Sequence, residues 1–301
     1  MTAPDDGSLS SFERLDGVVP PWRLRVPAAQ TAPVVFASPH SGRDYPPEFL
    51  AESRLDFLRL RRSEDAFVDE MFAAAPDFGA PLLCARFPRA YVDVNREAYE
   101  LDPAMFEDSL PDYVNTTSPR IAAGLGTIAR IVADGEEIYQ RALRFEEAKR
   151  RINSMYRPYH AALRRLLDQT VRRFGGCLLI DCHSMPSGVV NGPSKGDRID
   201  VVLGDCFGTT CAPAITDTVQ KELQAMDFSV ARNTPYAGGF TTRHYGRPKN
   251  GVHVLQIEFN RALYMDETRV SRGAGLPLLI RRIGRLMQAL AGIDPMVLKA
   301  S

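Results

Sequence analysis

Two histidines follow apolar segments at positions where an α/β protein exposes polar groups. His40 comes after VVFASP, and His183 ends the run CLLIDCH that begins at residue 177. Ligands of open α/β sheets bind beyond the carboxyl ends of the strands. Two such histidines and a carboxylate could hold a metal ion and leave one position for water, as catalytic zinc requires. A single histidine at a strand end is more often an ordinary polar residue.

The carboxylate of such a site is ambiguous in the sequence. Glu64 and Asp65 are adjacent, and both lie at the start of the apolar pattern of residues 63–75. Carboxylates at the start of a helix can equally serve the helix dipole. No H-E-x-x-H motif occurs, so local spacing alone does not identify a metal site.

Glu258 is an acid inside an otherwise apolar run, VHVLQIEFNR. Strand alternation places it on one face with Val254 and Gln256. A partly desolvated carboxyl has a raised pKa, which suits a general base. The alternative is an ion pair with Arg261 or another arginine.

A third group of polar residues, Asp93-Val94-Asn95-Arg96, ends the segment AYVDV. An arginine offers a planar fork that binds a carboxylate through two hydrogen bonds, and the neighbouring asparagine adds a donor or acceptor. Taken alone, Arg96 could equally be an ordinary surface arginine.

The elements that must position these residues alternate between apolar strands and helices. This order predicts an α/β fold with a mixed, mostly parallel central sheet between helices. We expect strands over 34–40, 81–87, 90–94, 177–183, 198–205 and 252–261, and helices over 63–75, 127–173, 212–226 and 270–292. Pro158 should kink or divide the longest helix.

The chain is expected to form a single catalytic domain over residues 31–301, because no linker or repeat interrupts residues 31–292. Residues 1–30 are polar and rich in proline, and they predict a loose N-terminal lead-in. The first residues lack the basic and apolar regions of a signal peptide, and no apolar stretch is long enough to span a membrane. We therefore expect a cytoplasmic protein.

The charge balance restricts the class of partner. The 301 residues contain 37 basic and 37 acidic side chains, so the formal net charge is zero. Such a chain offers no broad basic surface for nucleic acid or an anionic membrane. A local cationic pocket for a small anionic molecule is still compatible with it.

Several ordered motifs resemble the N-formylglutamate amidohydrolase family, from about residue 34 to 268. The motifs are Pro39-His40-Ser41-Gly42, Tyr45-Pro46, Glu64-Asp65, Phe67-Val68-Asp69, Val92-Asp93-Val94-Asn95-Arg96, Pro158-Tyr159-His160, Ile180-Asp181-Cys182-His183-Ser184-Met185-Pro186, Asn233-Thr234-Pro235-Tyr236-Ala237-Gly238-Gly239, Gln256-Ile257-Glu258-Phe259-Asn260-Arg261 and Leu263-Tyr264-Met265-Asp266.

That family resembles zinc carboxypeptidases and succinylglutamate desuccinylases in fold, which implies one Zn²⁺ per chain at the strand ends. Those relatives bind zinc through a His-x-x-Glu pair and a later histidine. Here Arg43 stands three residues after His40. The resemblance therefore implies His40, Asp65 and His183 as ligands, with Glu64 as the reserve. Another divalent metal could occupy such a site.

The resemblance also implies hydrolysis of N-formylglutamate, or of a similar acidic N-acyl amino acid, to formate and glutamate in histidine degradation. Glu258 would be the catalytic base, and Arg89 would stabilise the oxyanion. The implied substrate-binding residues are Asn95 and Arg96 for the α-carboxylate, Arg243 or Arg261 for the second carboxylate, and Gly239 for a close backbone approach. The oligomeric state is left open.

Alternative functions have weaker support in the sequence. A serine hydrolase of the nucleophile-elbow type is excluded because no G-x-S-x-G motif occurs. The glycines around Gly124 and Gly126 fit a dinucleotide fingerprint only loosely, since no strand precedes them. A carboxypeptidase-like or aspartoacylase-like deacylase would use the same site on another substrate. A metabolite-binding protein without catalysis is the alternative of a different class.

Overall fold

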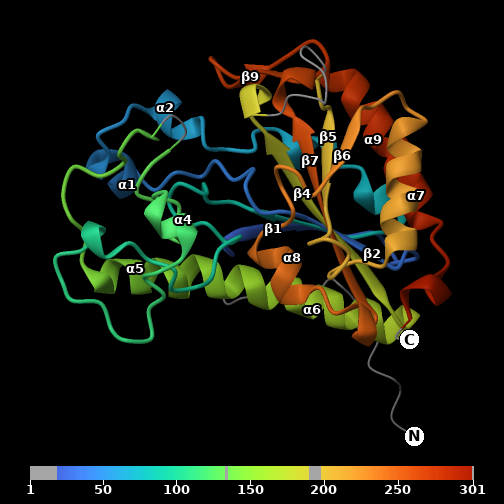
Figure 1. Ribbon diagram of the computed structural model, residues 1–301, viewed down its shortest axis with the longest axis horizontal. Coiled ribbons are helices and arrows are strands. Elements are labelled where there is room, and N and C mark those ends of the chain that lie inside the picture. The colour runs from blue at the N-terminus through green and yellow to red at the C-terminus, as the bar shows by residue number, and fades with distance from the viewer. Residues whose placement is uncertain (1–18, 133–134, 190–197, 300–301) are drawn as a thin grey trace, which may run out of the picture.

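A central sheet with helices on both faces organises the chain (Figure 1). The computed structural model describes residues 19–132, 135–189 and 198–299. The first 18 residues of the expected lead-in therefore lie outside the described residues. Of the rest, Trp22–Arg25 forms β1, the first edge strand of the sheet.

The sheet has seven strands in the order β1-β3-β2-β4-β7-β5-β6. Pairing is antiparallel between β1 and β3 and between β5 and β7, and parallel at the other four junctions. The expected mixed, mostly parallel α/β sheet is thus confirmed. The further strands are β2 (Val34–Ser38), β3 (Leu82–Ala85), β4 (Cys177–Met185), β5 (Val201–Gly204), β6 (Val230–Arg232) and β7 (Val252–Asn260), and β8 (Met265–Asp266) pairs with β9 (Ser271–Arg272) outside this sheet.

The central strands β2, β4 and β7 are buried along almost their whole length, as expected for strands covered on both faces. Their register sets the site, because His183 of β4 pairs with Glu258 of β7. On β7, Leu255 and Ile257 belong to one core, whereas Val254 belongs to the core on the opposite face. This alternation confirms the predicted orientation of Glu258.

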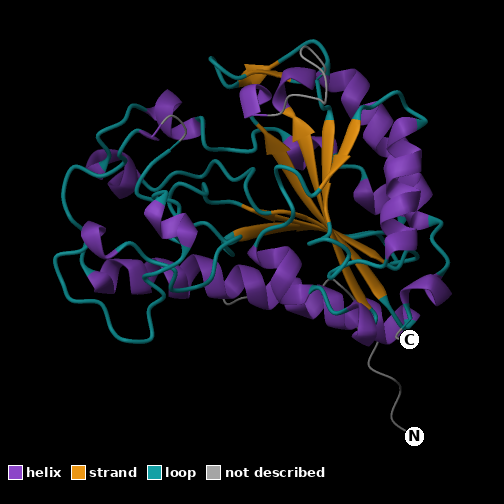
Figure 2. Ribbon diagram, in the orientation of Figure 1, coloured by secondary structure: helices purple, strands orange, loops and turns teal. Residues whose placement is uncertain are grey.

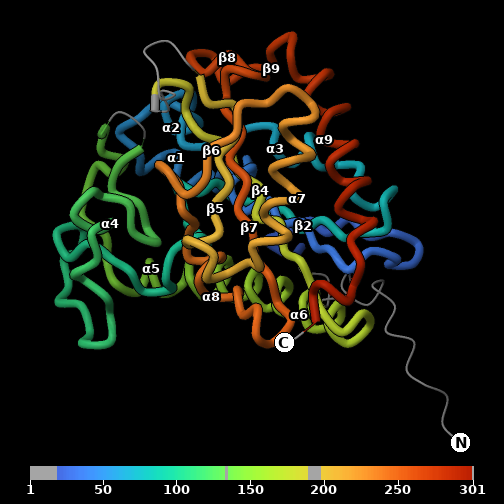
Figure 3. The backbone as a smooth tube through the Cα atoms, turned by 45° about the vertical axis from the view of Figure 1, so that its right-hand side comes forward, coloured from blue at the N-terminus to red at the C-terminus, as the bar shows by residue number. Residues whose placement is uncertain are grey.

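Helices cover the two faces of the sheet. The helix α6 (Arg157–Phe174) runs along one face, and α7 (Pro213–Gln224) and α9 (Leu276–Ala291) pack on the other (Figure 2). The turned view shows α7 and α9 side by side (Figure 3). The shorter helices are α1 (Pro47–Glu52), α2 (Phe57–Arg61), α3 (Val68–Met71), α4 (Pro119–Ala122), α5 (Phe145–Arg151) and α8 (Phe240–Tyr245). No described helix is long and apolar enough to cross a membrane.

Three predicted elements differ from the structure. The helix predicted over 63–75 is only α3, because Phe67 adopts φ = 68°, a left-handed conformation that a helix cannot contain. The strand predicted over 90–94 is absent, and the segment forms turns. The helix predicted over 127–173 begins only at Phe145, since a bridge between Phe106 and Leu143 holds the preceding chain extended. A π-helical turn over Ile152–Tyr156 separates α5 from α6, and Pro158 lies in the first turn of α6, in agreement with the expected division of the helix.

Candidate active site

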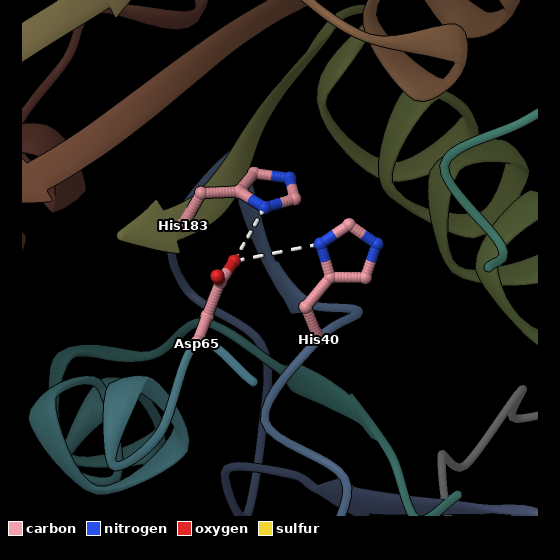
Figure 4. Close-up of side chains that lie close together, drawn as sticks. All are labelled: His40, Asp65 and His183. Atoms are coloured by element: carbon pink, nitrogen blue, oxygen red, sulfur yellow. Dashed lines mark hydrogen bonds and ion pairs between the residues drawn. The ribbon is translucent and has the colours of Figure 1, made fainter. Parts of the chain in front are cut away.

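Three buried side chains from distant parts of the chain converge at the strand ends (Figure 4). Oδ2 of Asp65 lies 2.9 Å from Nδ1 of His183 and 3.4 Å from Nδ1 of His40. Nδ1 of His40 is buried and has no hydrogen-bond partner among the described residues. A buried nitrogen without a partner is costly. It faces an anionic oxygen and a second imidazole, so the donor set suits a divalent cation.

Each of the three residues is placed by a different element. His40 lies two residues beyond the end of β2, and His183 is on β4, which pairs in parallel with β2. Asp65 comes from the loop between α2 and α3, where its backbone N–H donates to the carbonyl of His40 at 3.0 Å. The loop is therefore tied directly to the strand end that carries the first histidine.

The outer nitrogen of each histidine faces a carboxylate. Nε2 of His40 lies 2.7 Å from Oδ1 of Asp93. Nε2 of His183 lies 3.1 Å from Oδ2 of Asp181, a side chain that is completely buried. A carboxylate on one ring nitrogen keeps the proton there and leaves the lone pair of the other nitrogen for a metal. Both histidines are thus oriented with Nδ1 toward Asp65.

The electrostatics of the cluster attract positive charge. Burial opposes ionisation of Asp65, yet the hydrogen bond from His183 and the proximity of His40 hold its pKa well below the usual range. Burial likewise opposes protonation of His183, but the charges and hydrogen bonds of Asp181 and Asp65 raise its pKa well above the usual value. The same negative charges that hold a proton on His183 would stabilise a dication between these side chains.

Glu258 lies beside this cluster as a separate buried acid. Burial raises its pKa to about 7, and the charge of Asp65 adds to the increase, while His183 and Arg89 oppose it. Nε2 of Gln256 donates to its Oε1 at 2.9 Å. No ion pair joins Glu258 to a cation in the described parts of the chain, so the alternative pairing with Arg261 is not observed; that guanidinium binds Asp65 at 3.1 Å instead.

A cavity of about 200 Å³ opens onto these groups. Its charged lining contains both acids and bases, with Asp65, Asp93 and Glu258 beside Arg62, Arg89 and Arg261. Its other wall is mostly apolar, formed by Leu125, Ala129, Ile131 and Val132. The cavity can therefore accommodate a small molecule that carries both negative charge and aliphatic carbon.

Arg89 is the predicted oxyanion residue, and it lines this cavity. Its Nη2 donates to Oδ2 of Asp93 at 2.7 Å, and its Nη1 lies 4.0 Å from Oδ1 of Asp65. Asp93 therefore orients both Arg89 and His40. Asp93 belongs to the motif of residues 92–96, but the sequence did not indicate this orienting role.

Asn95 and Arg96 are not among the residues that line the cavity. Nε of Arg96 donates to the carbonyl of Leu125 at 2.8 Å, and Nη1 donates to the carbonyl of Asn95 at 2.8 Å. Nδ2 of Asn95 lies 3.2 Å from Nε2 of His183, and its Oδ1 accepts from the backbone N–H of Thr241. Both residues hold the walls of the site together in this structure, and their contact with a substrate carboxylate stays a prediction.

Gly239 has a packing role that the sequence did not indicate. A Cβ atom at this position would lie 2.3 Å from the side-chain amide of Asn95. Its backbone N–H donates to Oε1 of Gln256 at 2.9 Å. The absence of a side chain at Gly239 therefore makes room for Asn95, and its predicted close approach to the ligand stays a prediction.

Two of the remaining predicted residues lie away from the cluster. Glu64 accepts hydrogen bonds from Tyr45 and Arg61, so the reserve ligand is engaged elsewhere. Arg243 is exposed and lines a separate surface hollow with Arg247 and Lys249. Arg261 lines the main cavity, but its Nε and Nη2 bind Ser184 and Asp65.

An α/β sheet that holds a buried His-Asp-His cluster beside a cavity, with the aspartate of the cluster and a separate buried glutamate in the cavity wall, has the arrangement of a hydrolytic enzyme. The model of the family described as "N-formylglutamate amidohydrolase" matches residues 32–265, and this chain belongs to that family. It is similar to a crystal structure of N-formylglutamate amidohydrolase from Ralstonia eutropha, with 38% identity, a TM-score of 0.85, and coverage of 91% of this chain and 98% of that chain. It is 29% identical to N-formylglutamate deformylases of Pseudomonas putida and Pseudomonas aeruginosa, over 78% of this chain and 83% of each relative.

Proposed function

We propose that this chain hydrolyses the amide bond of N-formylglutamate, giving formate and glutamate, with the aid of a divalent metal ion, Zn²⁺ in the first instance. Its relatives are named for this activity. The single observation that carries the proposal is the convergence of His40, Asp65 and His183 beside a cavity that Asp65 and Glu258 line.

His40, Asp65 and His183 would hold the metal. When bound, a dication polarises the acyl oxygen and lowers the pKa of a neighbouring water. Asp93 and Asp181 keep Nδ1 of the two histidines turned toward the site. Glu64, already hydrogen-bonded to Arg61 and Tyr45, is not proposed as a ligand.

Glu258 moves the proton. As a carboxylate it accepts a proton from the water that attacks the formyl carbon, and it then donates this proton to the amide nitrogen as the C–N bond breaks. Its buried position and raised pKa suit both steps, because a group with a pKa near 7 accepts and releases a proton at neutral pH. Arg89 lies in the same cavity and would stabilise the negative charge that develops on the acyl oxygen.

The substrate class follows from the cavity lining. The arginines favour an anion, and the apolar wall formed by Leu125, Ala129, Ile131 and Val132 can cover an aliphatic side chain. With Arg96 bonded to backbone carbonyls, we propose Arg89 and Arg261 as the cations nearest the substrate. We further propose that this reaction belongs to histidine degradation and takes place in the cytoplasm.

The test is a panel of N-formyl, N-acetyl and N-succinyl amino acids assayed together with metal analysis. We expect one Zn²⁺ per chain, formate release from N-formylglutamate, and loss of both in His40→Ala and His183→Ala. Glu64→Gln is the matched control and should keep its metal. Full activity of metal-free protein would overturn the mechanism, faster turnover of an N-acetyl or N-succinyl substrate would identify a different deacylase, and binding without turnover would identify a metabolite-binding protein.

A further inference from the structure

Tyr236 is a cavity residue to which neither the sequence motifs nor the proposed mechanism gives a role. It belongs to the segment Asn233-Thr234-Pro235-Tyr236-Ala237-Gly238-Gly239 and lines the cavity with Glu258, Arg89 and Arg261. Its ring packs against the small core cluster formed by Met185, Ile199 and Val202. The ring is thus fixed by apolar contacts, while the residue still reaches the site.

The hydroxyl of Tyr236 makes no hydrogen bond within the described parts of the chain. Three other tyrosines make a hydrogen bond through theirs: Tyr156 donates to the carbonyl of Arg96, Tyr45 donates to Glu64, and Tyr245 bonds to His160. A phenol that is half-buried in a cavity without a protein partner is placed to bind a ligand.

The backbone that carries Tyr236 is held tightly against the sheet. A Cβ atom at Gly204, the last residue of β5, would lie 2.9 Å from the carbonyl oxygen of Tyr236. The N–H of Cys206 donates to the carbonyl of Ala237 at 2.7 Å, and the amide of Asn233 donates to Asp205 at 2.8 Å. These contacts fix the position of the phenol before any ligand binds.

The phenol is a neutral donor among charged groups. Burial raises the pKa of Tyr236, and the negative charge of Glu258 adds to this effect, so the hydroxyl keeps its proton at neutral pH. Arg89 and Arg261 already bind Asp93 and Asp65. A protonated phenol can bind an anion without having to leave an existing ion pair.

We propose that Tyr236 is a specificity-determining residue whose hydroxyl donates a hydrogen bond to the α-carboxylate of the substrate. This inference rests on the proposed function. In an N-acyl amino acid, one carbon separates the α-carboxylate from the amide nitrogen that receives the proton of Glu258. The hydroxyl of Tyr236, which has Glu258 among its charged neighbours, is therefore expected to lie nearer to the α-carboxylate of the substrate than to its side-chain carboxylate.

The test compares Tyr236→Phe with wild type on N-formylglutamate and on its α-amide, N-formylisoglutamine. Loss of a hydrogen bond to a charged group should lower kcat/KM for N-formylglutamate roughly 10- to 100-fold, mainly through KM. Turnover of the α-amide should change little. N-formylglutamine, which keeps the α-carboxylate, should show the same loss as N-formylglutamate.

Tyr113→Phe is the matched control, because it removes the same atom from an exposed tyrosine whose ring packs edge-to-face with Tyr99 and Phe145. Equal losses on the acid and the α-amide, or no loss on either, would overturn the role of Tyr236 and leave the proposed function intact. Calorimetric titration with L-glutamate gives an independent measurement, in which Tyr236→Phe should bind at least tenfold more weakly. A wild-type protein that releases no formate would overturn both proposals.

Discussion

Glu258 carries its charge in a place where water contributes little to stabilising it. Only 7% of its surface is exposed, and among the described residues one hydrogen bond, from Gln256, is made to its carboxylate. Burial therefore raises its pKa to about 7. The nearby charges of His183 and Arg89 act in the opposite direction and keep the ionised form accessible at neutral pH.

This pKa predicts the acid limb of the pH profile. The reaction needs the carboxylate, so kcat/KM should fall as the pH decreases through the pKa of Glu258, approaching tenfold per pH unit. A bound dication stabilises the carboxylate, so in the metal-loaded enzyme the midpoint should lie below 7. Glu258→Gln should lower kcat roughly 10²- to 10⁴-fold, as expected for a lost general base.

The measurement is kcat/KM from pH 5 to 8 for the wild type and the variant, with metal content determined for each sample. The residual activity of Glu258→Gln should not show the decrease of kcat/KM at low pH. A wild-type profile that is flat over this range, or a variant with more than a tenth of the wild-type kcat, would show that another group takes the proton.

At the scale of elements, a short turn holds both histidines. Asp93 contacts Nε2 of His40, and Asn95 lies 3.2 Å from Nε2 of His183. The start of α8 packs against the same turn, where Thr241 donates to Asn95 and the missing side chain of Gly239 leaves space for it. The turn and α8 therefore act together as a support for the site.

Gly239→Ala should disturb this support. The new Cβ atom would lie 2.3 Å from the amide of Asn95, so this side chain must move away from His183. We expect kcat/KM to fall at least tenfold and the melting temperature to fall by a few degrees. Steady-state kinetics with N-formylglutamate and thermal unfolding check both effects.

Gly284→Ala is the control for this substitution. Gly284 lies within α9, and the nearest atom to an added Cβ is Cζ of Phe78 at 4.0 Å. Alanine favours the helix by up to about 1 kcal/mol, so this variant should keep its activity and unfold at the same or a higher temperature. A Gly239→Ala enzyme that behaves like this control would mean that the position of Asn95 is unimportant.

The sequence predicts the central strands well, because β4 and β7 are mainly apolar runs that are buried along almost their whole length. It predicts the turn around Asp93 poorly. AYVDV is an apolar, valine-rich run as strands often are, yet the segment is held as a turn by its side-chain contacts, including those of Asp93 with His40 and Arg89. The contact with His40 spans 53 residues of the chain, so the local sequence pattern does not contain it.

The same distinction applies to the site residues. His40 and His183 are visible in the sequence because each lies at or just beyond the end of an apolar run, and strand order brings them together. In the folded chain Glu64 binds Arg61 and Tyr45, which leaves Asp65 as the acid beside the two histidines. A single sequence does not show these contacts. Nothing in the sequence around Tyr236 indicates a ligand-binding role, because tyrosines in turns are common in positions that bind no ligand.

At the scale of the whole molecule, the cluster joins segments that are far apart in sequence. Asp65 and His183 are separated by 118 residues, and Arg261 joins Asp65 across 196 residues. All of these side chains are buried on the folded chain and dispersed when it unfolds. A cation that binds this cluster therefore binds the native state far more tightly than the unfolded state, and it stabilises the fold by mass action.

Metal removal should consequently lower the stability of the entire protein. At a free metal concentration about 100 times the Kd, the stabilisation is about 2.7 kcal/mol, which corresponds to a melting temperature roughly 5 °C higher than in chelator. The measurement is thermal unfolding of wild type with Zn²⁺ and with chelator, beside His183→Ala and Glu64→Gln. His183→Ala should lose the difference and Glu64→Gln should keep it, because only the former removes a metal ligand. Identical melting temperatures for the wild type in both conditions would contradict a metal site at these residues.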